Sequence, residues 1–152
     1  MRTVYVETSV WGMVPPDQNP TLRRPTLEFL RRCENRLILP HISTIVTNEI
    51  FDAPEKSREA IAKQLDVVDP VLVTVSPEAQ MLARRFIAEG ILPKRRFDDA
   101  QHVACALFNE LDALVSWNYR HIANVTKAAA FNAVAALAGI RGRLEIHTPL
   151  EV

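Results

Sequence analysis

The sequence contains acidic and amide side chains that could together bind a divalent metal ion. Mg²⁺ and Mn²⁺ prefer oxygen ligands and take one or a few carboxylates, leaving coordination places for water and phosphate oxygens. Such an ion can activate water and stabilise the charge that develops on phosphate during hydrolysis. Gathered carboxylates repel one another unless a cation compensates them. The candidate residues are Glu7, Glu49, Asp99 and Asn118.

Glu7 is the least ordinary of these residues. It directly follows the apolar run Val4–Val6, and an acid in that position must find a partner or reach an open site. Glu49 lies between Ile45 and Ile50 in a segment of helical spacing. Because most glutamates on helices are solvated surface residues, a role in a site and a place on the surface both remain open for Glu49.

Asp98 and Asp99 begin another segment of helical spacing and have an ordinary explanation. Acids at a helix N-terminus cap free backbone N–H groups, which stabilises a helix by about 0.5–2 kcal/mol, and they interact favourably with the helix dipole. Asp98, with Gln101 three residues later, fits the capping role better. Asp99 is therefore the stronger candidate for a site.

The elements that must position these residues alternate along the chain as strand and helix. Apolar, β-branched runs predict strands at Val4–Val6, Leu37–Leu39, Val71–Val75, Ala113–Ser116 and Leu144–Ile146, with the second ending at Pro40. Helices are expected at Thr26–Glu34, from Ser43 to Pro54, at Glu55–Leu65, Pro77–Glu89, from Phe97 onward and at Lys127–Leu137, after a loop at Pro15–Pro20.

This alternation predicts a single α/β domain over residues 1–152, with a mainly parallel sheet of about five strands. Parallel strands place their carboxyl ends at one edge of the sheet, where α/β proteins form their sites. If the sheet is parallel, at least three of the positions Glu7, Glu49, Asp98–Asp99 and Asn118 can reach that edge.

Composition adds limits on the setting. Eighteen basic and eighteen acidic residues give zero formal net charge, so binding to a nucleic acid must use local patches. The two cysteines have no metal-ligand spacing, and no long apolar stretch resembles a signal peptide or membrane span. We expect a reduced, cytoplasmic protein.

Four blocks of sequence, in order, resemble the PIN-domain family, which includes VapC-like toxins of toxin–antitoxin pairs. The resemblance covers nearly the whole chain. The blocks are Val4-Tyr5-Val6-Glu7-Thr8-Ser9-Val10, Thr47-Asn48-Glu49-Ile50, Asp98-Asp99-Ala100-Gln101-His102-Val103-Ala104-Cys105-Ala106 and Leu114-Val115-Ser116-Trp117-Asn118-Tyr119-Arg120-His121-Ile122.

The resemblance implies a sheet of order 3-2-1-4-5 and Mg²⁺- or Mn²⁺-dependent cleavage of RNA. The family's three acids fall on Glu7, Glu49 and Asp99, its hydroxyl position falls on Thr8 beside Ser9, and its fourth acid falls on Asn118. Glutamate at position 7 adds a methylene to the usual aspartate, and Asn118 keeps an oxygen but removes a charge, so we expect weaker metal binding than in an all-acid site.

Other side chains have both a functional and an ordinary interpretation. Lys94, Arg95 and Arg96 precede the acidic pair, and Arg120 follows Asn118, so all four are candidates for phosphate contact, although such residues are commonly solvated surface. His102 can share a helix face with Asp98 and Asp99, but a carboxylate partner or burial is the simpler expectation. Trp11 and Trp117 could stack on a base, but packing is the simpler expectation.

Three functions remain open at this point. The first is a metal-dependent ribonuclease, for which the resemblance implies an antitoxin partner and a homodimer. The second is a binding module that acts through RNA or a partner protein without cleaving. The third is a phosphatase-like hydrolase that uses the same carboxylates. No glycine-rich phosphate loop or nucleophile elbow is present.

Overall fold

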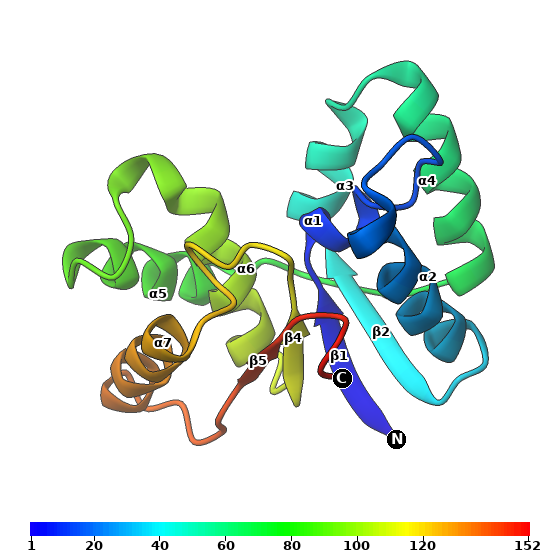
Figure 1. Ribbon diagram of the computed structural model, residues 1–152. Coiled ribbons are helices and arrows are strands. Elements are labelled where there is room, and N and C mark those ends of the chain that lie inside the picture. The colour runs from blue at the N-terminus through cyan, green and yellow to red at the C-terminus, as the bar shows by residue number, and fades with distance from the viewer.

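A single parallel sheet organises the protein (Figure 1), as described by a computed structural model of residues 1–152. All four strand pairings are parallel, and the strand order is β3-β2-β1-β4-β5. The structure thus confirms both the predicted α/β class and the predicted order. The strands are β1 (Arg2–Val6), β2 (Ile38–Ser43), β3 (Val71–Val73), β4 (Ala113–Val115) and β5 (Glu145–His147).

The helices form two groups beside the sheet (Figure 1). We call α1 to α4 the first lobe, and α5 to α7 with the 3₁₀ helix η1 the second lobe. They are α1 (Thr8–Trp11), α2 (Pro20–Glu34), α3 (Thr44–Phe51), α4 (Glu55–Val68), α5 (Pro77–Ala88), η1 (Lys94–Arg96), α6 (Phe97–Phe108) and α7 (Val125–Leu137).

The centre of the sheet is also the point where the chain order reverses. Strand β1 pairs with β2 on one side and with β4 on the other. In open α/β sheets such a reversal opens a crevice at the carboxyl ends of the two strands, and ligands bind there. Both strands beside this crevice are buried, since Val4–Val6 and Ala113–Val115 are inaccessible to solvent. Strands of a parallel sheet are covered on both faces and therefore consist of continuous apolar runs.

Helix α2 begins six residues earlier than the pattern predicted, at Pro20 instead of Thr26. The prolines around position 20 were interpreted as loop, but Pro20 stands at the first helical position, where its missing N–H costs nothing. The Asn19 side chain caps this helix by accepting a hydrogen bond from the Thr21 N–H at 3.0 Å. Pro25 is accommodated inside the helix.

Strand β2 does not end at Pro40, as predicted, but runs through it to Ser43. Proline cannot donate a hydrogen bond and is tolerated where a strand has a free side. Strand β3 pairs only with His41–Ser43, so β2 is paired on one side alone at Pro40. The other predicted boundaries differ by up to three residues, the usual uncertainty of element ends.

Two further observations concern the whole chain. Cys33 and Cys105 are both buried and form no disulfide. No helix combines the length and apolar character needed to cross a lipid bilayer.

Candidate functional site

Glu7 stands where β1 ends and caps the short helix α1. Its Oε2 accepts hydrogen bonds from the Ser9 N–H at 3.1 Å, from the Ser9 hydroxyl, and from the Ser116 hydroxyl at 2.8 Å. Only 4% of the residue is exposed. Because all these bonds go to Oε2, the carboxylate is fixed at the sheet edge while Oε1 accepts no hydrogen bond.

Glu49 reaches the same edge from α3. Its Oε1 accepts hydrogen bonds from His102 Nε2 at 2.6 Å and from the Thr8 hydroxyl at 2.9 Å. Its side chain is 35% exposed, so Glu49 is neither an ordinary surface residue nor a buried one. Ser43 caps the N-terminus of α3, because its hydroxyl accepts a hydrogen bond from the Ile45 N–H at 3.2 Å.

His102 joins the two glutamates. It is fully buried, and its Nε2 lies 4.0 Å from Glu7 Oε1 in addition to its contact with Glu49. Its Nδ1 lies 2.7 Å from the Tyr5 hydroxyl, which in turn lies 2.7 Å from the Ser43 hydroxyl. A buried chain of polar contacts therefore links β1, β2, α3 and α6 beneath the acids.

The charges in this cluster change one another's pKa values. Burial opposes the charge of His102, but the hydrogen bond to Glu49 and the charge of Glu7 outweigh it and raise the His102 pKa. Burial likewise opposes the charge of Glu49, but the hydrogen bond and charge of His102 lower its pKa overall. The imidazole thus stabilises negative charge on Glu49.

Asp99 and Asn118 complete the cluster from the second lobe. Burial raises the Asp99 pKa first, and the negative charge of Glu7 raises it further. Asn118 Nδ2 lies 3.4 Å from Asp99 Oδ2, and Asn118 Oδ1 accepts a hydrogen bond from the His121 N–H at 3.1 Å. The three acids therefore lie close enough for their charges to interact.

The prediction for Asp98 was wrong in its details. Helix α6 has no side-chain cap, and Arg96 occupies the capping position. Asp98 is exposed, and its Oδ1 accepts a hydrogen bond from Gln101 Nε2 at 3.2 Å. It makes no contact with the carboxylate cluster, but it lies in the first turn of α6, where its negative charge favours the helix dipole. Thr8 and Ser9, in contrast, do hold the two glutamates.

Three contributors were missed from the sequence: Tyr5, Ser43 and Ser116. Ser116 donates to Glu7 and also accepts from the Asn118 N–H at 2.9 Å, so it connects two predicted site residues. The Tyr5 hydroxyl contacts His102 Nδ1, and the Ser43 hydroxyl contacts Tyr5 in turn. The available signal was a polar group on each otherwise apolar strand, because such a group must find a partner when it is buried.

The donor chemistry of the cluster fits a hard divalent cation. Glu7 Oε1, Glu49 Oε2 and Asp99 Oδ1 accept no hydrogen bond within the protein. No group of three His, Cys, Asp or Glu side chains is close enough in this structure to hold an ion as a complete set. Mg²⁺ usually keeps several waters and takes one or two carboxylates directly, so the donor set suits it without a three-residue cage.

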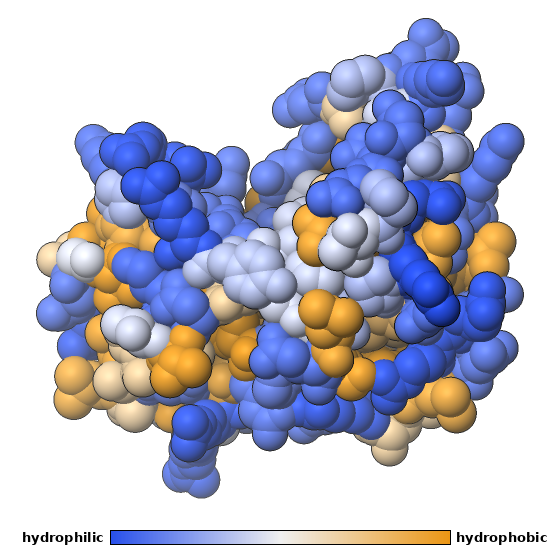
Figure 2. Space-filling model, in the orientation of Figure 1, coloured by the Kyte–Doolittle hydropathy of each residue, from blue (hydrophilic) through white to orange (hydrophobic).

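The basic residues lie beside this cluster. Lys94, Arg95 and Arg96 form η1, directly before α6, and all three are exposed, as is Arg120. The charge of Arg96 acts on Asp99 and offsets part of the rise in its pKa. Figure 2 shows a hollow between the two lobes, with hydrophilic surface on both sides.

Both tryptophans pack instead of facing the hollow. Trp11 is fully buried and its indole N–H donates to the Val6 carbonyl at 3.2 Å. Trp117 is 7% exposed and its indole N–H donates to the Thr26 hydroxyl at 2.8 Å. The packing interpretation is confirmed.

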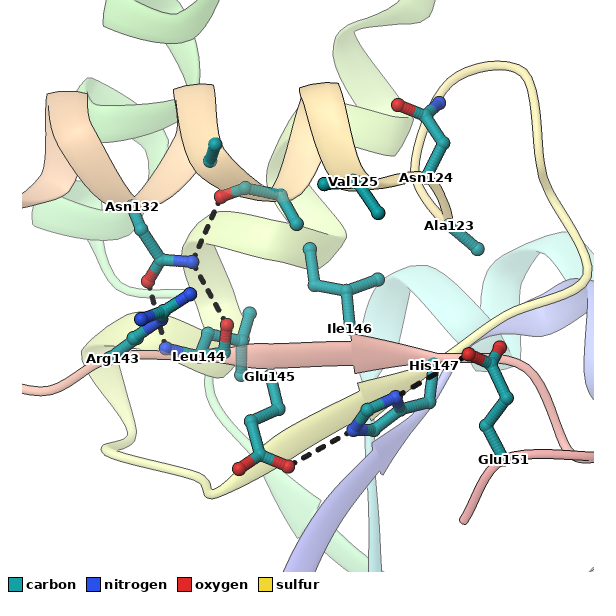
Figure 3. Close-up of a pocket in the computed structure, with 12 residues that line it drawn as sticks. Ala123, Asn124, Val125, Asn132, Arg143, Leu144, Glu145, Ile146, His147 and Glu151 are labelled. Atoms are coloured by element: carbon teal, nitrogen blue, oxygen red, sulfur yellow. Dashed lines mark hydrogen bonds and ion pairs between the residues drawn. The ribbon is translucent and has the colours of Figure 1, made fainter.

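A pocket of about 580 Å³ lies elsewhere, between β5 and α7 (Figure 3). Within it, the Asn132 side chain donates to the Leu144 carbonyl and accepts from the Leu144 N–H, both at 2.9 Å. His147 lies between Glu145 and Glu151. These contacts pair backbone groups at the edge of the sheet and the charged side chains beside it. No member of the carboxylate cluster lines the pocket.

No protein-family model matches this chain, and a search of curated proteins finds no match to it. The resemblance to PIN domains therefore stays a prediction.

Proposed function

We propose that this protein is a divalent-metal-dependent endoribonuclease that hydrolyses the phosphodiester bonds of RNA. The observation that carries the proposal is the meeting of Glu7, Glu49 and Asp99 at one edge of the sheet, although they come from three distant segments. His102 contacts both glutamates, and the Asp99 pKa is raised first by burial and then by the charge of Glu7. Mutual repulsion of this kind favours binding of a cation.

The proposed roles follow from the contacts. Glu7, Glu49 and Asp99 would hold Mg²⁺ or Mn²⁺, one or two of them directly and the others through its bound waters. The ion would supply water activation and compensation of charge on the phosphate. Ser9 and Ser116 keep Glu7 in place, and Thr8 and His102 keep Glu49 in place. Such fixed supporting contacts limit the cost of organising the ligands. Asn118, beside Asp99, is positioned to hold water or a phosphate oxygen.

The resemblance to VapC-like toxins supplies the finer part of the proposal. It suggests a toxin that acts with a cognate antitoxin and forms a homodimer in the cytoplasm.

A second candidate, a module that binds RNA or a partner protein without cleaving, is favoured by one specific observation. His102 already places an imidazole against Glu49 and near Glu7. If that imidazole carries the compensating charge, the cluster is stable without a metal ion.

The test is cleavage of labelled single-stranded and structured RNA with Mg²⁺, Mn²⁺ or excess chelator. The informative variant is Asp99→Asn, which removes one proposed ligand. Its matched control is Asp98→Asn, which changes the neighbouring exposed acid that lies outside the cluster. A phosphomonoester substrate is assayed in parallel to detect phosphatase activity.

The proposal expects cleavage that requires metal, survives in Asp98→Asn and falls by at least about 100-fold in Asp99→Asn. Circular dichroism verifies that both variants fold. RNA binding by folded protein without cleavage under any condition would instead support the binding module. Hydrolysis of the phosphomonoester but not of RNA would assign the site to a phosphatase.

A further inference from the structure

Four cations near the carboxylate cluster have no acidic partner. They come from two segments: Arg95 and Arg96 lie in η1, and Arg120 and Lys127 lie in the loop after β4 and at the start of α7. None of them lies within 4.0 Å of a carboxylate oxygen, as is true of every lysine and arginine side chain except Arg2, Arg24 and Arg36.

The two segments are fixed against each other. The Lys127 ammonium group donates a hydrogen bond to the Ile91 carbonyl, just before η1. Asn124 caps α7 by accepting from the Lys127 N–H at 2.8 Å, and its amide donates to the Tyr119 carbonyl at 2.7 Å. The loop that carries Arg120 is thereby held in one shape.

His121 lies on the loop that joins these cations to the carboxylate cluster. It is 9% exposed, and its N–H bonds to Asn118, the residue beside Asp99. Burial lowers the His121 pKa, and the charges of Arg96, Arg120, Lys127 and Arg95 lower it further. Asn118 thus connects the loop that carries Arg120 to Asp99, and η1 leads directly into α6, the helix that carries Asp99. Both segments that carry the cations therefore adjoin the carboxylate cluster.

We propose that Arg95, Arg96, Arg120 and Lys127 form a binding site for an internal backbone phosphate of single-stranded RNA, on the second-lobe side of the carboxylate cluster. The choice of RNA rests on the proposed function. Unpaired cations supply most of the sequence-independent affinity for a nucleic acid, and flexible single strands can follow a bent surface between two lobes. A phosphate held here would place the neighbouring phosphodiester bond beside Asp99 and Asn118.

The test measures binding of a fluorescently labelled single-stranded RNA by anisotropy in excess chelator, over a series of salt concentrations. The variants are Arg96→Gln and Arg120→Gln, because both side chains are exposed and make no hydrogen bond within the fold. The matched control is Arg31→Gln, an exposed and unpaired arginine on α2, in the first lobe (Figure 1).

We expect each site variant to weaken binding about 3- to 10-fold and to reduce the slope of log K against log salt by about 0.7, the value for one lost phosphate contact on a single strand. Arg31→Gln should change neither quantity. Equal effects of all three substitutions would overturn the proposal. Because the assay contains no metal, its result does not depend on whether the protein cleaves RNA. If the protein binds RNA through these cations but does not cleave it, the proposed nuclease function is wrong and the phosphate site stands.

A second comparison identifies the source of the phosphate. The same RNA is tested with a 5′-hydroxyl and with a 5′-phosphate. Equal affinities, both weakened by Arg120→Gln, support an internal backbone phosphate. A preference of about tenfold or more for the 5′-phosphate form, lost in Arg120→Gln, would assign the site to a terminal phosphate and overturn the backbone assignment.

Discussion

His102 Nε2 lies 2.6 Å from Glu49 Oε1, although the two residues are 53 positions apart in the sequence. The His102 ring is itself held in place, since its other nitrogen, Nδ1, lies 2.7 Å from the Tyr5 hydroxyl. The Glu49 carboxylate is therefore positioned by residues of the core as well as by its own helix, α3.

This contact predicts strong coupling between His102 and Glu49 in stability. A double-mutant cycle with His102→Ala and Glu49→Ala, read from the free energy of unfolding in denaturant, should give a coupling energy of about 0.5–3 kcal/mol. The reason is that either single change already removes the hydrogen bond. A cycle between His102→Ala and Arg31→Ala, whose side chain lies on α2 away from the cluster, should be additive. Additivity in the first cycle would contradict the role assigned to this contact.

The carboxylate cluster predicts stabilisation by metal. If Mg²⁺ or Mn²⁺ binds only the folded protein, an ion at 100 times its dissociation constant should raise the free energy of unfolding by about 2.7 kcal/mol. Asp99→Asn should lose most of this gain, and Asp98→Asn should keep it. In chelator, Asp99→Asn should be no less stable than the natural protein, because burial and the charge of Glu7 disfavour the Asp99 carboxylate. Thermal unfolding with and without metal measures both effects.

A separate carboxylate predicts how stability depends on pH. Asp112 accepts hydrogen bonds from the Thr3 N–H at 2.8 Å and the Thr3 hydroxyl at 3.0 Å, and the backbone bond is the main cause of its lowered pKa. A carboxyl whose folded pKa is lowered stabilises the fold above its unfolded pKa, about 3.9, and loses that contribution as pH falls through the folded pKa.

The natural protein should therefore be more stable than Asp112→Asn at pH 6, and the difference should shrink as the pH falls below about 4. Denaturant unfolding at a series of pH values measures this difference. Asp17→Asn, at an exposed acid that accepts no hydrogen bond, should show little difference at any pH. A gap between Asp112→Asn and the natural protein that stays constant down to pH 2 would show that the charge of Asp112 does not matter.

The sequence by itself determined the fold class and the place of Glu7 at the end of β1, because an apolar run predicts a strand and a polar residue directly after it stands at the strand end. The strand order was expected only from the resemblance, since a local pattern does not say which strands pair. Pro40 and Pro20 show the limit of the local pattern: each was interpreted as a break, and each is accommodated by its position, on a half-paired strand and at a helix start.

Only the tertiary structure decided which side chains join those acids. Asp98 and Asp99 are adjacent in sequence, yet one faces solvent and the other faces the cluster, because successive residues on a helix point in different directions. His102, Tyr5 and Ser43 meet beneath Glu49 only because β1, β2 and α6 pack together. Hydrogen bonds between distant segments depend on positions to within a fraction of an ångström, and a one-dimensional pattern does not contain that information.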